Sequence, residues 1–324
     1  MISGITGQDG GLLAALLLQK SYRVVGLLPV DRTSNCFRLD YLQINDKVRK
    51  IQVDLLDSTQ LKNLMEEIKP DEFYNLASIS SVSLSFKLPH ETFGFNTRSV
   101  MNILEAIRLV SPETSFYQAS SSEMFGNIGH ESLPIRESFL FHPVSPYGIS
   151  KASAHWLTVN YREAFKLKTC CGILFNHESA LRPRNFVIKK IVRTALQIKK
   201  GEEIKLSLGN TSIIRDWGYA PYYVDAMWRM LQHDKMNDYL ICSGTNTRLH
   251  DVVTKVFESL NLDAGKYVYT DTTLLRSLDL EIIYGDNSKA KRELGWKYDV
   301  TMDDLIHKLV QDEQALMTWE EVNV

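Results

Sequence analysis

The residues Gly4-Ile-Thr-Gly-Gln-Asp-Gly10 form a glycine-rich turn with the spacing G-x-x-G-x-x-G, and an apolar helical segment, Leu12–Leu18, follows at once. Glycines let the backbone turn tightly and approach a pyrophosphate, whose charge then lies at the N-terminus of the helix. Many glycine-rich turns before helices are only turns. The position of this one, at the start of the first strand–helix unit, favours a dinucleotide site.

Strand and helix patterns alternate from this turn onward. Strands are expected at 23–28, 50–53, 73–77, 115–119 and 170–175, and helices at 58–68, 97–110 and 146–165. Such alternation predicts a parallel sheet covered by helices on both faces, and right-handed crossovers make it a doubly wound, Rossmann-type α/β fold.

The later segments suggest a second, smaller region interleaved with the first. We expect a dinucleotide-binding domain over 1–175, to which 215–248 return with a further strand at 239–242. Residues 176–214 and 249–324 are expected to form the C-terminal substrate-binding region. Its helices are expected near 186–200, 249–260 and 302–316.

Composition narrows the functional classes. The 324 residues carry 37 Lys plus Arg and 39 Asp plus Glu, so nothing suggests a non-specific nucleic-acid surface. No apolar run reaches membrane-spanning length and no signal peptide is visible, so we expect a cytoplasmic protein that does not bind membranes. The four cysteines form no C-x-x-C pair, which favours reduced structural cysteines over a metal site.

The segment Tyr147-Gly-Ile-Ser-Lys151 places a tyrosine and a lysine on one face at the start of a helix. A nearby ammonium lowers the pKa of a phenol, so Tyr147 could take a proton from a sugar hydroxyl. A tyrosine and a lysine at this spacing are common by chance, and the alternative to a catalytic pair is an ordinary pair on a surface helix. Its order after the glycine turn, and after a serine-rich strand end, makes it more specific.

That strand end contains Ser121, Ser122 and Glu123. Hydroxyls beside a carboxylate at the carboxyl end of a strand favour a ligand site, and the alternative is a helix-capping serine run with a solvated glutamate. Asp54 also ends a strand, where it could accept a hydrogen bond from an adenine amine or cap the next helix, as Asp57 could. Asn75-Leu-Ala-Ser78 ends another strand at the edge where open α/β sheets bind ligands.

Together these motifs resemble the extended short-chain dehydrogenases, and within them the GDP-mannose 4,6-dehydratases. The motifs that carry the resemblance extend from the glycine turn to about Trp296. They are residues 4–10, Tyr117-Gln-Ala-Ser, Ser-Pro-Tyr147-Gly, Gly172-Ile-Leu-Phe-Asn-His-Glu-Ser179, Asn185-Phe-Val, Arg215-Asp-Trp-Gly218, Asp225-Ala-Met-Trp228, Gly285-Asp and Lys289-Ala-Lys. The Asn-His-Glu-Ser and Arg-Asp-Trp-Gly stretches are much more specific than the glycine turn.

The resemblance implies a three-step reaction on one tightly held cofactor. Tyr147 deprotonates the sugar O4 while hydride leaves C4; Glu123 then removes the C5 proton and water leaves from C6. The hydride returns to C6, giving a 4-keto-6-deoxy sugar. Ser121, where such relatives usually have threonine, hydrogen-bonds the O4 region. A nucleotide-sugar reductase or epimerase is the main alternative, and Glu123 would be dispensable in it; a non-catalytic cofactor-binding regulator and a polyol or sterol dehydrogenase are weaker ones.

The resemblance also assigns the remaining site residues and the partners. The catalytic residues are Ser121, Glu123, Tyr147 and Lys151. The cofactor residues are Gly4, Gly7, Gln8, Asp9, Gly10, Arg32, Asp54, Leu55, Leu76, Ala77, Ser78, Tyr147, Lys151, His177 and Arg182. The substrate residues are Ser85, Ser121, Asn176, Glu178, Asn185, Lys190, Arg215 and Arg276. The structural alternative for Arg215 is a salt bridge to Asp216 or Asp225. The implied substrate is a GDP-sugar. The implied assembly is a homodimer, through helices 97–110 and 146–165, or a homotetramer.

Two segments depart from the family pattern. Such dehydratases usually carry an arginine pair, which grips the 2′-phosphate of NADP, where this chain has Pro29–Val30. Arg32, Ser34 and Arg38 could replace that pair, whereas Asp31 could bind a ribose 2′-hydroxyl, so NADP is expected and NAD stays open. The same segment leaves dimer and tetramer open. Residues 78–83 differ from the usual Ala-Gln-Ser-His pattern, which leaves mannose, a modified hexose or a heptose as the sugar.

Overall fold

The computed structural model describes residues 1–30, 35–275 and 279–323. Its centre is a seven-stranded sheet in the order β11-β6-β5-β4-β1-β2-β3, with every neighbouring pair parallel. The strands are β1 (Ile2–Ser3), β2 (Val25–Leu28), β3 (Arg49–Gln52), β4 (Glu72–Asn75), β5 (Ser115–Ser121), β6 (Thr169–Leu174) and β11 (Tyr239–Ile241). The doubly wound α/β fold is thus confirmed, and the strand order reverses between β1 and β4.

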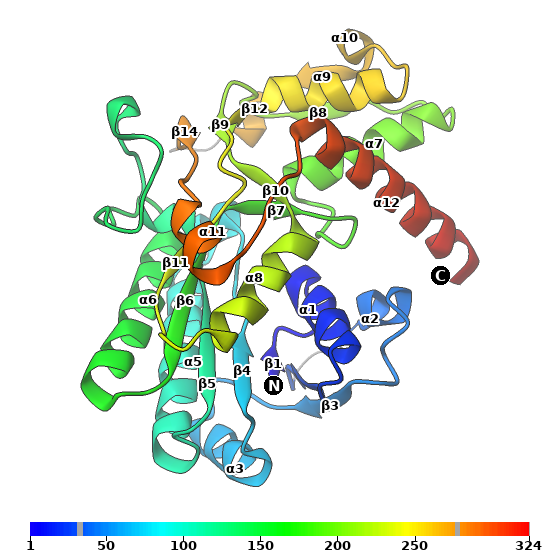
Figure 1. The fold of residues 1–324 in the computed structure, drawn as a ribbon. Helices are drawn as coiled ribbons and strands as arrows, with labels where there is room; N and C mark the ends of the chain where they lie inside the picture. The colour runs from blue at the N-terminus through cyan, green and yellow to red at the C-terminus, as the bar shows by residue number, and fades with distance from the viewer. Residues whose placement is uncertain (31–34, 276–278, 324) are drawn as a thin grey trace.

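Helices cover both faces of this sheet (Figure 1). One face carries α1 (Gln8–Gln19), α8 (Ala220–Gln232) and α11 (Ser288–Leu294), whose apolar side chains share one core with the strands. The other face carries α3 (Ser58–Ile68), α5 (Pro89–Val110) and α6 (Pro146–Phe165), which form a separate core. Two short helices, α2 (Phe37–Tyr41) and α4 (Val82–Lys87), lie in connections.

Local capping explains why α3 and α6 have the predicted bounds. Asp57 accepts hydrogen bonds from the backbone N–H groups of Thr59 and Gln60 at 2.9 and 3.0 Å, so it, and not Asp54, caps α3. Ser145 accepts from the Gly148 N–H at 3.0 Å before Pro146 opens α6. In contrast, α5 begins at Pro89 and not at 97, and α12 ends at Asn323 and not at 316.

A second group of elements lies beyond the carboxyl edge of the sheet (Figure 1). A core of its own joins α7 (Val187–Lys199), α9 (Leu249–Ser259) and α12 (Met302–Asn323) with β8 (Leu206–Leu208). The remaining short elements, none of which was predicted from the sequence, are β7 (Asn176–Glu178), β9 (Ile214–Arg215), β10 (Trp217–Tyr219), β12 (Thr247–Arg248), α10 (Ala264–Tyr267), β13 (Val268–Thr270), β14 (Ile282–Ile283) and the 3-10 turns η1 (Ser122–Met124), η2 (His130–Ser132) and η3 (Thr272–Leu274).

The predicted domain division stays a prediction, although β11 does join the main sheet as expected. Strands of two or three residues show too little periodicity to be read from sequence. Within the described ranges, no helix is both long and apolar enough to cross a membrane.

Candidate active site

The glycine turn lies against the end of β4. Gly4 has a φ of +72°, and a Cβ there would lie 2.8 Å from the backbone nitrogen of Ala77. A Cβ on Gly10 would lie 2.2 Å from the Gly4 carbonyl oxygen, so side chains are excluded at both positions. Gly7 is the N-cap of α1, and no side chain in the described structure caps this helix. The first N–H groups of α1 are therefore available to an anion.

His177 ties β7 to the start of α1. Its Nε2 lies 2.9 Å from an Asp9 carboxylate oxygen, its Nδ1 lies 2.7 Å from the Phe175 carbonyl, and its ring stacks on Tyr223 at 4.6 Å between centroids. Burial alone would raise the pKa of Asp9, but His177, the hydrogen bond from Gln8 and the charge of Arg182 lower it to about 2.

Gln8 and Arg182 reinforce this connection. The Gln8 amide donates to the His177 carbonyl at 3.2 Å and accepts from the Ser179 hydroxyl at 2.8 Å. Arg182 donates to the same His177 carbonyl at 2.7 Å. Four predicted cofactor residues, Gln8, Asp9, His177 and Arg182, thus meet at the N-terminus of α1 although 168 residues separate Asp9 from His177.

The remaining predicted cofactor residues follow β3 and β4 at the same edge of the sheet. Asp54 is exposed and accepts a hydrogen bond from the Leu56 N–H at 2.9 Å, which leaves the capping of α3 to Asp57. Leu55 is buried. Leu76, Ala77 and Ser78, which the sequence predicted as cofactor residues, directly follow β4. Their roles toward adenine and nicotinamide stay predictions.

The four predicted catalytic residues come together where β5 ends and α6 begins. The phenol of Tyr147 is hydrogen-bonded to the side chain of Ser121, and the half-buried Glu123 is close enough for its charge to act on that phenol. The ammonium of Lys151 lies 5.8 Å from the centre of the Tyr147 ring and donates to the Ala119 carbonyl at 2.8 Å. This arrangement can exchange a proton with a bound hydroxyl and place a second base beside it.

The expected lowering of the phenol pKa is wrong for this structure. Burial raises the pKa of Tyr147 to about 12, although the hydrogen bond from Ser121 opposes the rise. Burial also lowers the pKa of Lys151 to about 8. The ammonium is bonded to a backbone carbonyl and not to the phenol oxygen, so sequence spacing alone overstated its effect on Tyr147.

The predicted substrate residues lie in different surroundings. Asn176 is half-buried on β7 and Asn185 is exposed before α7. Ser85 is fully buried and its hydroxyl donates to the Val82 carbonyl at 2.7 Å. Glu178 is 3% exposed, with a carboxylate oxygen 3.4 Å from Nε of Arg182. Ser85 and Glu178 therefore already have internal contacts.

The basic candidates also contact protein groups. Lys190 donates to the Ser207 carbonyl at 2.6 Å. Arg215 forms a salt bridge with Asp279 at 3.0 Å. The two carboxylates that the sequence offered as its partners have other contacts. Asp225 pairs with Arg229, and Asp216 accepts hydrogen bonds from the Ser243 and Gly244 N–H groups. Arg32 and Arg276 lie outside the described residues.

Sequence reasoning missed Asn96, which is buried on α5. Its side-chain oxygen accepts from the Ile79 N–H at 2.8 Å and from the Ser78 hydroxyl, and its amide donates to the Ser150 hydroxyl at 2.9 Å. Asn96 thus joins the segment after β4 to α6 beside Lys151. An asparagine beside the apolar stripe of this helix was the available signal.

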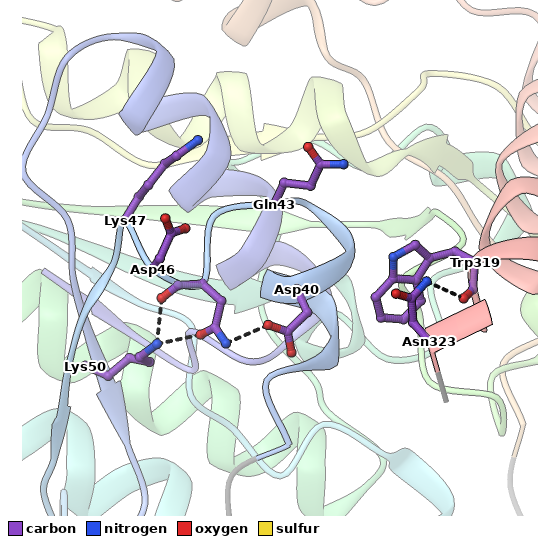
Figure 2. A pocket seen from close by; sticks show the side chains of 8 residues that line it. Asp40, Gln43, Asp46, Lys47, Lys50, Trp319 and Asn323 are labelled. Carbon is purple, nitrogen blue, oxygen red and sulfur yellow. Dashed lines mark hydrogen bonds between the residues drawn. The ribbon is translucent and has the colours of Figure 1, made fainter. Parts of the chain in front are cut away.

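An open cavity lies away from this site. It has a volume of about 750 Å³ and lies between the α2–β3 segment and the end of α12, where Lys50, Asp40 and Trp319 line it (Figure 2). Asn45 also lines it, accepting a hydrogen bond from Lys50 and donating one to Asp40. None of the described site residues lines it. Its open, mixed-charge lining does not resemble a nucleotide site. Within the described residues no cluster of metal-ligating side chains occurs.

Comparisons with known proteins show the family of this chain. The family model described as GDP-mannose 4,6 dehydratase matches residues 1–309. GDP-mannose 4,6 dehydratase 2 from Arabidopsis thaliana is 41% identical, over 100% of this chain and 89% of that protein.

Two solved structures share the fold at low sequence identity. A dTDP-glucose 4,6-dehydratase from Streptomyces venezuelae, solved with NAD, has a TM-score of 0.86 at 20% identity and covers 98% of this chain and 97% of its own. RMD from Pseudomonas aeruginosa, solved with NADPH, has a TM-score of 0.80 at 23% identity and covers 97% of this chain and 98% of its own.

Proposed function

This chain belongs to the GDP-mannose 4,6-dehydratase family, and from that premise we propose that it is a hydro-lyase acting on GDP-mannose or a closely related GDP-sugar. The reaction oxidises C4, eliminates water across C5 and C6, and yields a 4-keto-6-deoxy sugar. The observation that carries the proposal is the convergence of Ser121, Glu123 and Tyr147 at one strand end beside the glycine turn.

The residues around the glycine turn fit a dinucleotide. Gly4 and Gly10 leave no room for a Cβ, and the uncapped start of α1 offers N–H groups to a pyrophosphate. NADP, when bound, supplies the hydride acceptor for C4 and the donor for C6, and its oxidised ring adds positive charge that favours a phenolate. We assign Gln8, Asp9, His177 and Arg182 to holding the β7 segment against this site.

Tyr147 takes the proton from the sugar O4 in the first step. A phenol whose pKa is raised to about 12 is a weak acid, so the positive charge of Lys151 must help to stabilise the phenolate. The Ser121 hydroxyl shares a hydrogen bond with the phenol and so fixes the direction in which it accepts a proton. Both residues touch the reacting hydroxyl in this proposal.

Glu123 removes the C5 proton after C4 has become a ketone. The C5–H electron pair then forms the double bond and the C6–O bond breaks. The departing hydroxide takes from Glu123 the proton that came from C5, so it leaves as water and the carboxylate is regenerated. Glu123 lies in η1, which begins directly after Ser121, and its charge acts on the phenol of Tyr147; both observations support this role.

A panel of GDP-, dTDP-, UDP- and CDP-sugars tests the proposal by mass spectrometry. A GDP-sugar product lighter by one water, formed without added reductant, supports it. Glu123→Gln should abolish this product yet still bind NADPH, whereas Glu91→Gln, an exposed carboxylate on α5, should leave it unchanged. Dehydration by Glu123→Gln at the normal rate would contradict the role of Glu123; a product of unchanged or reduced mass would indicate the epimerase or reductase alternative.

We also propose that the chain forms a homodimer through α5 and α6, which pack side by side on one face of the sheet (Figure 1). Exposed apolar side chains lie on these helices: Met101, Leu109, Ile149, Trp156 and Phe165, each 43% to 58% exposed. Trp156→Lys should convert the dimer to a monomer in light scattering. The cytoplasmic location stays a prediction.

A further inference from the structure

A chain of buried hydrogen bonds crosses three strands below the catalytic residues. The Ser3 hydroxyl donates to the Asn75 side-chain oxygen at 2.6 Å, and the Asn75 amide donates to the Gln118 side-chain oxygen at 2.8 Å. The Gln118 amide donates to the Ala119 carbonyl at 3.1 Å. That carbonyl also accepts the Lys151 ammonium at 2.8 Å. The chain therefore ends on the same oxygen atom that holds Lys151.

The three side chains share one level of the sheet. Ser3 pairs with Asn75 between β1 and β4, and Asn75 pairs with Gln118 between β4 and β5. All three are at most 2% exposed. Central strands of a parallel sheet are normally apolar, and a buried amide without hydrogen bonds is costly. Polar residues at three adjacent central positions therefore call for a role that apolar side chains cannot fill.

The other end of the chain reaches the backbone beside the glycine turn. The Ser3 hydroxyl accepts hydrogen bonds from the N–H groups of Leu76 and Ala77 at 3.1 and 3.2 Å. A Cβ on Gly4 would lie within 3.0 Å of the same two residues. One continuous polar chain thus fixes both the backbone beside the glycine turn and the acceptor of the catalytic lysine.

We propose that Gln118 is a positioning residue for Lys151, acting through the Ala119 carbonyl and supported by Asn75 and Ser3. Its amide gives the carbonyl a second donor, so the oxygen cannot rotate away from the ammonium. The inference rests on the proposed function only for the catalytic role of Lys151. The positioning of Lys151 by Gln118 rests on the hydrogen bonds to the Ala119 carbonyl.

Two substitutions at Gln118 separate positioning from general packing. Gln118→Met keeps the volume but removes the donor, and kcat for GDP-mannose should fall roughly tenfold to hundredfold, with KM little changed. Gln118→Glu places a carboxylate near the ammonium, so the Lys151 pKa should rise and the pH profile should shift with it. The matched control is Thr158→Val, which removes a buried hydroxyl hydrogen bond on the same helix as Lys151. It should change neither kcat nor the pH profile.

A readout that needs no turnover is the titration of Lys151 followed by ¹⁵N NMR, with Lys151→Met to identify the signal. The titration midpoint should shift in opposite directions in Gln118→Met and Gln118→Glu. If both variants match Thr158→Val in midpoint and pH profile, the inference is overturned. If the wild type does not dehydrate any GDP-sugar but the midpoint still responds to Gln118, the proposed function fails and the positioning role stands.

Discussion

Gly10→Ala should damage the cofactor site more than any other single methyl group that can be added to the glycine turn. The new Cβ would lie 2.2 Å from the Gly4 carbonyl oxygen, 2.7 Å from the Ile5 Cα and 2.9 Å from the Gly4 carbonyl carbon. All three are backbone atoms, so no side chain can rotate away. The first gap must open to at least 3.0 Å, which moves the turn against β4.

The expected magnitude combines two opposing effects. Overpacking costs about 1–3 kcal/mol, whereas alanine gains about 1 kcal/mol over glycine within a helix. We therefore expect a net loss of up to about 2 kcal/mol in the free energy of unfolding. The N–H groups at the start of α1 shift with the turn, so the Kd for NADPH should rise by roughly tenfold or more.

Two other glycines make a graded series. A Cβ on Gly7 would lie 3.2 Å from the Gly4 carbonyl oxygen, and Gly94 on α5 has nothing within 4 Å. Gly94→Ala should stabilise the fold by about 0.5–1 kcal/mol and leave NADPH binding unchanged, with Gly7→Ala in between. Urea unfolding and NADPH fluorescence titration measure both quantities. If Gly10→Ala binds NADPH as tightly as Gly94→Ala does, the steric reasoning is refuted.

Two further predictions concern buried charge. Asp238→Asn removes the charge partner of Arg162, which lies 2.6 Å away with both side chains 18% exposed, and should lower the free energy of unfolding by about 2–4 kcal/mol in urea. Glu67→Gln, in an exposed pair with Arg49, should lower it by under about 0.5 kcal/mol. Equal losses in the two variants would contradict this prediction. Burial opposes the ionisation of Asp9, but His177 outweighs it, and the pKa of Asp9 is lowered from 3.8 to about 2. The ionised carboxylate therefore contributes about 2 kcal/mol to the free energy of unfolding above pH 4, and this contribution is lost as the pH falls through 2. Asp9→Asn should thus be less stable at pH 7 but approach the wild type as the pH falls toward 2, and a difference independent of pH would speak against the pair.

Local signals in the chain were sufficient for the fold and for the outline of the site. The caps at Asp57 and Ser145 act within a few residues, which is why the bounds of α3 and α6 were predictable. The glycine turn is equally local. The alternation of strands and helices then implies one edge where Ser121, Glu123 and Tyr147 can meet.

Only the tertiary structure decided which groups contact one another. The pairing of Asp9 with His177, of Arg215 with Asp279, and of Lys151 with the Ala119 carbonyl each depends on strand order and register. Those are set by packing among residues far apart in the chain, and no periodicity in the sequence records them. For the same physical reason the raised pKa of Tyr147 could not be foreseen, because burial is a property of the folded molecule and not of the i to i+4 spacing.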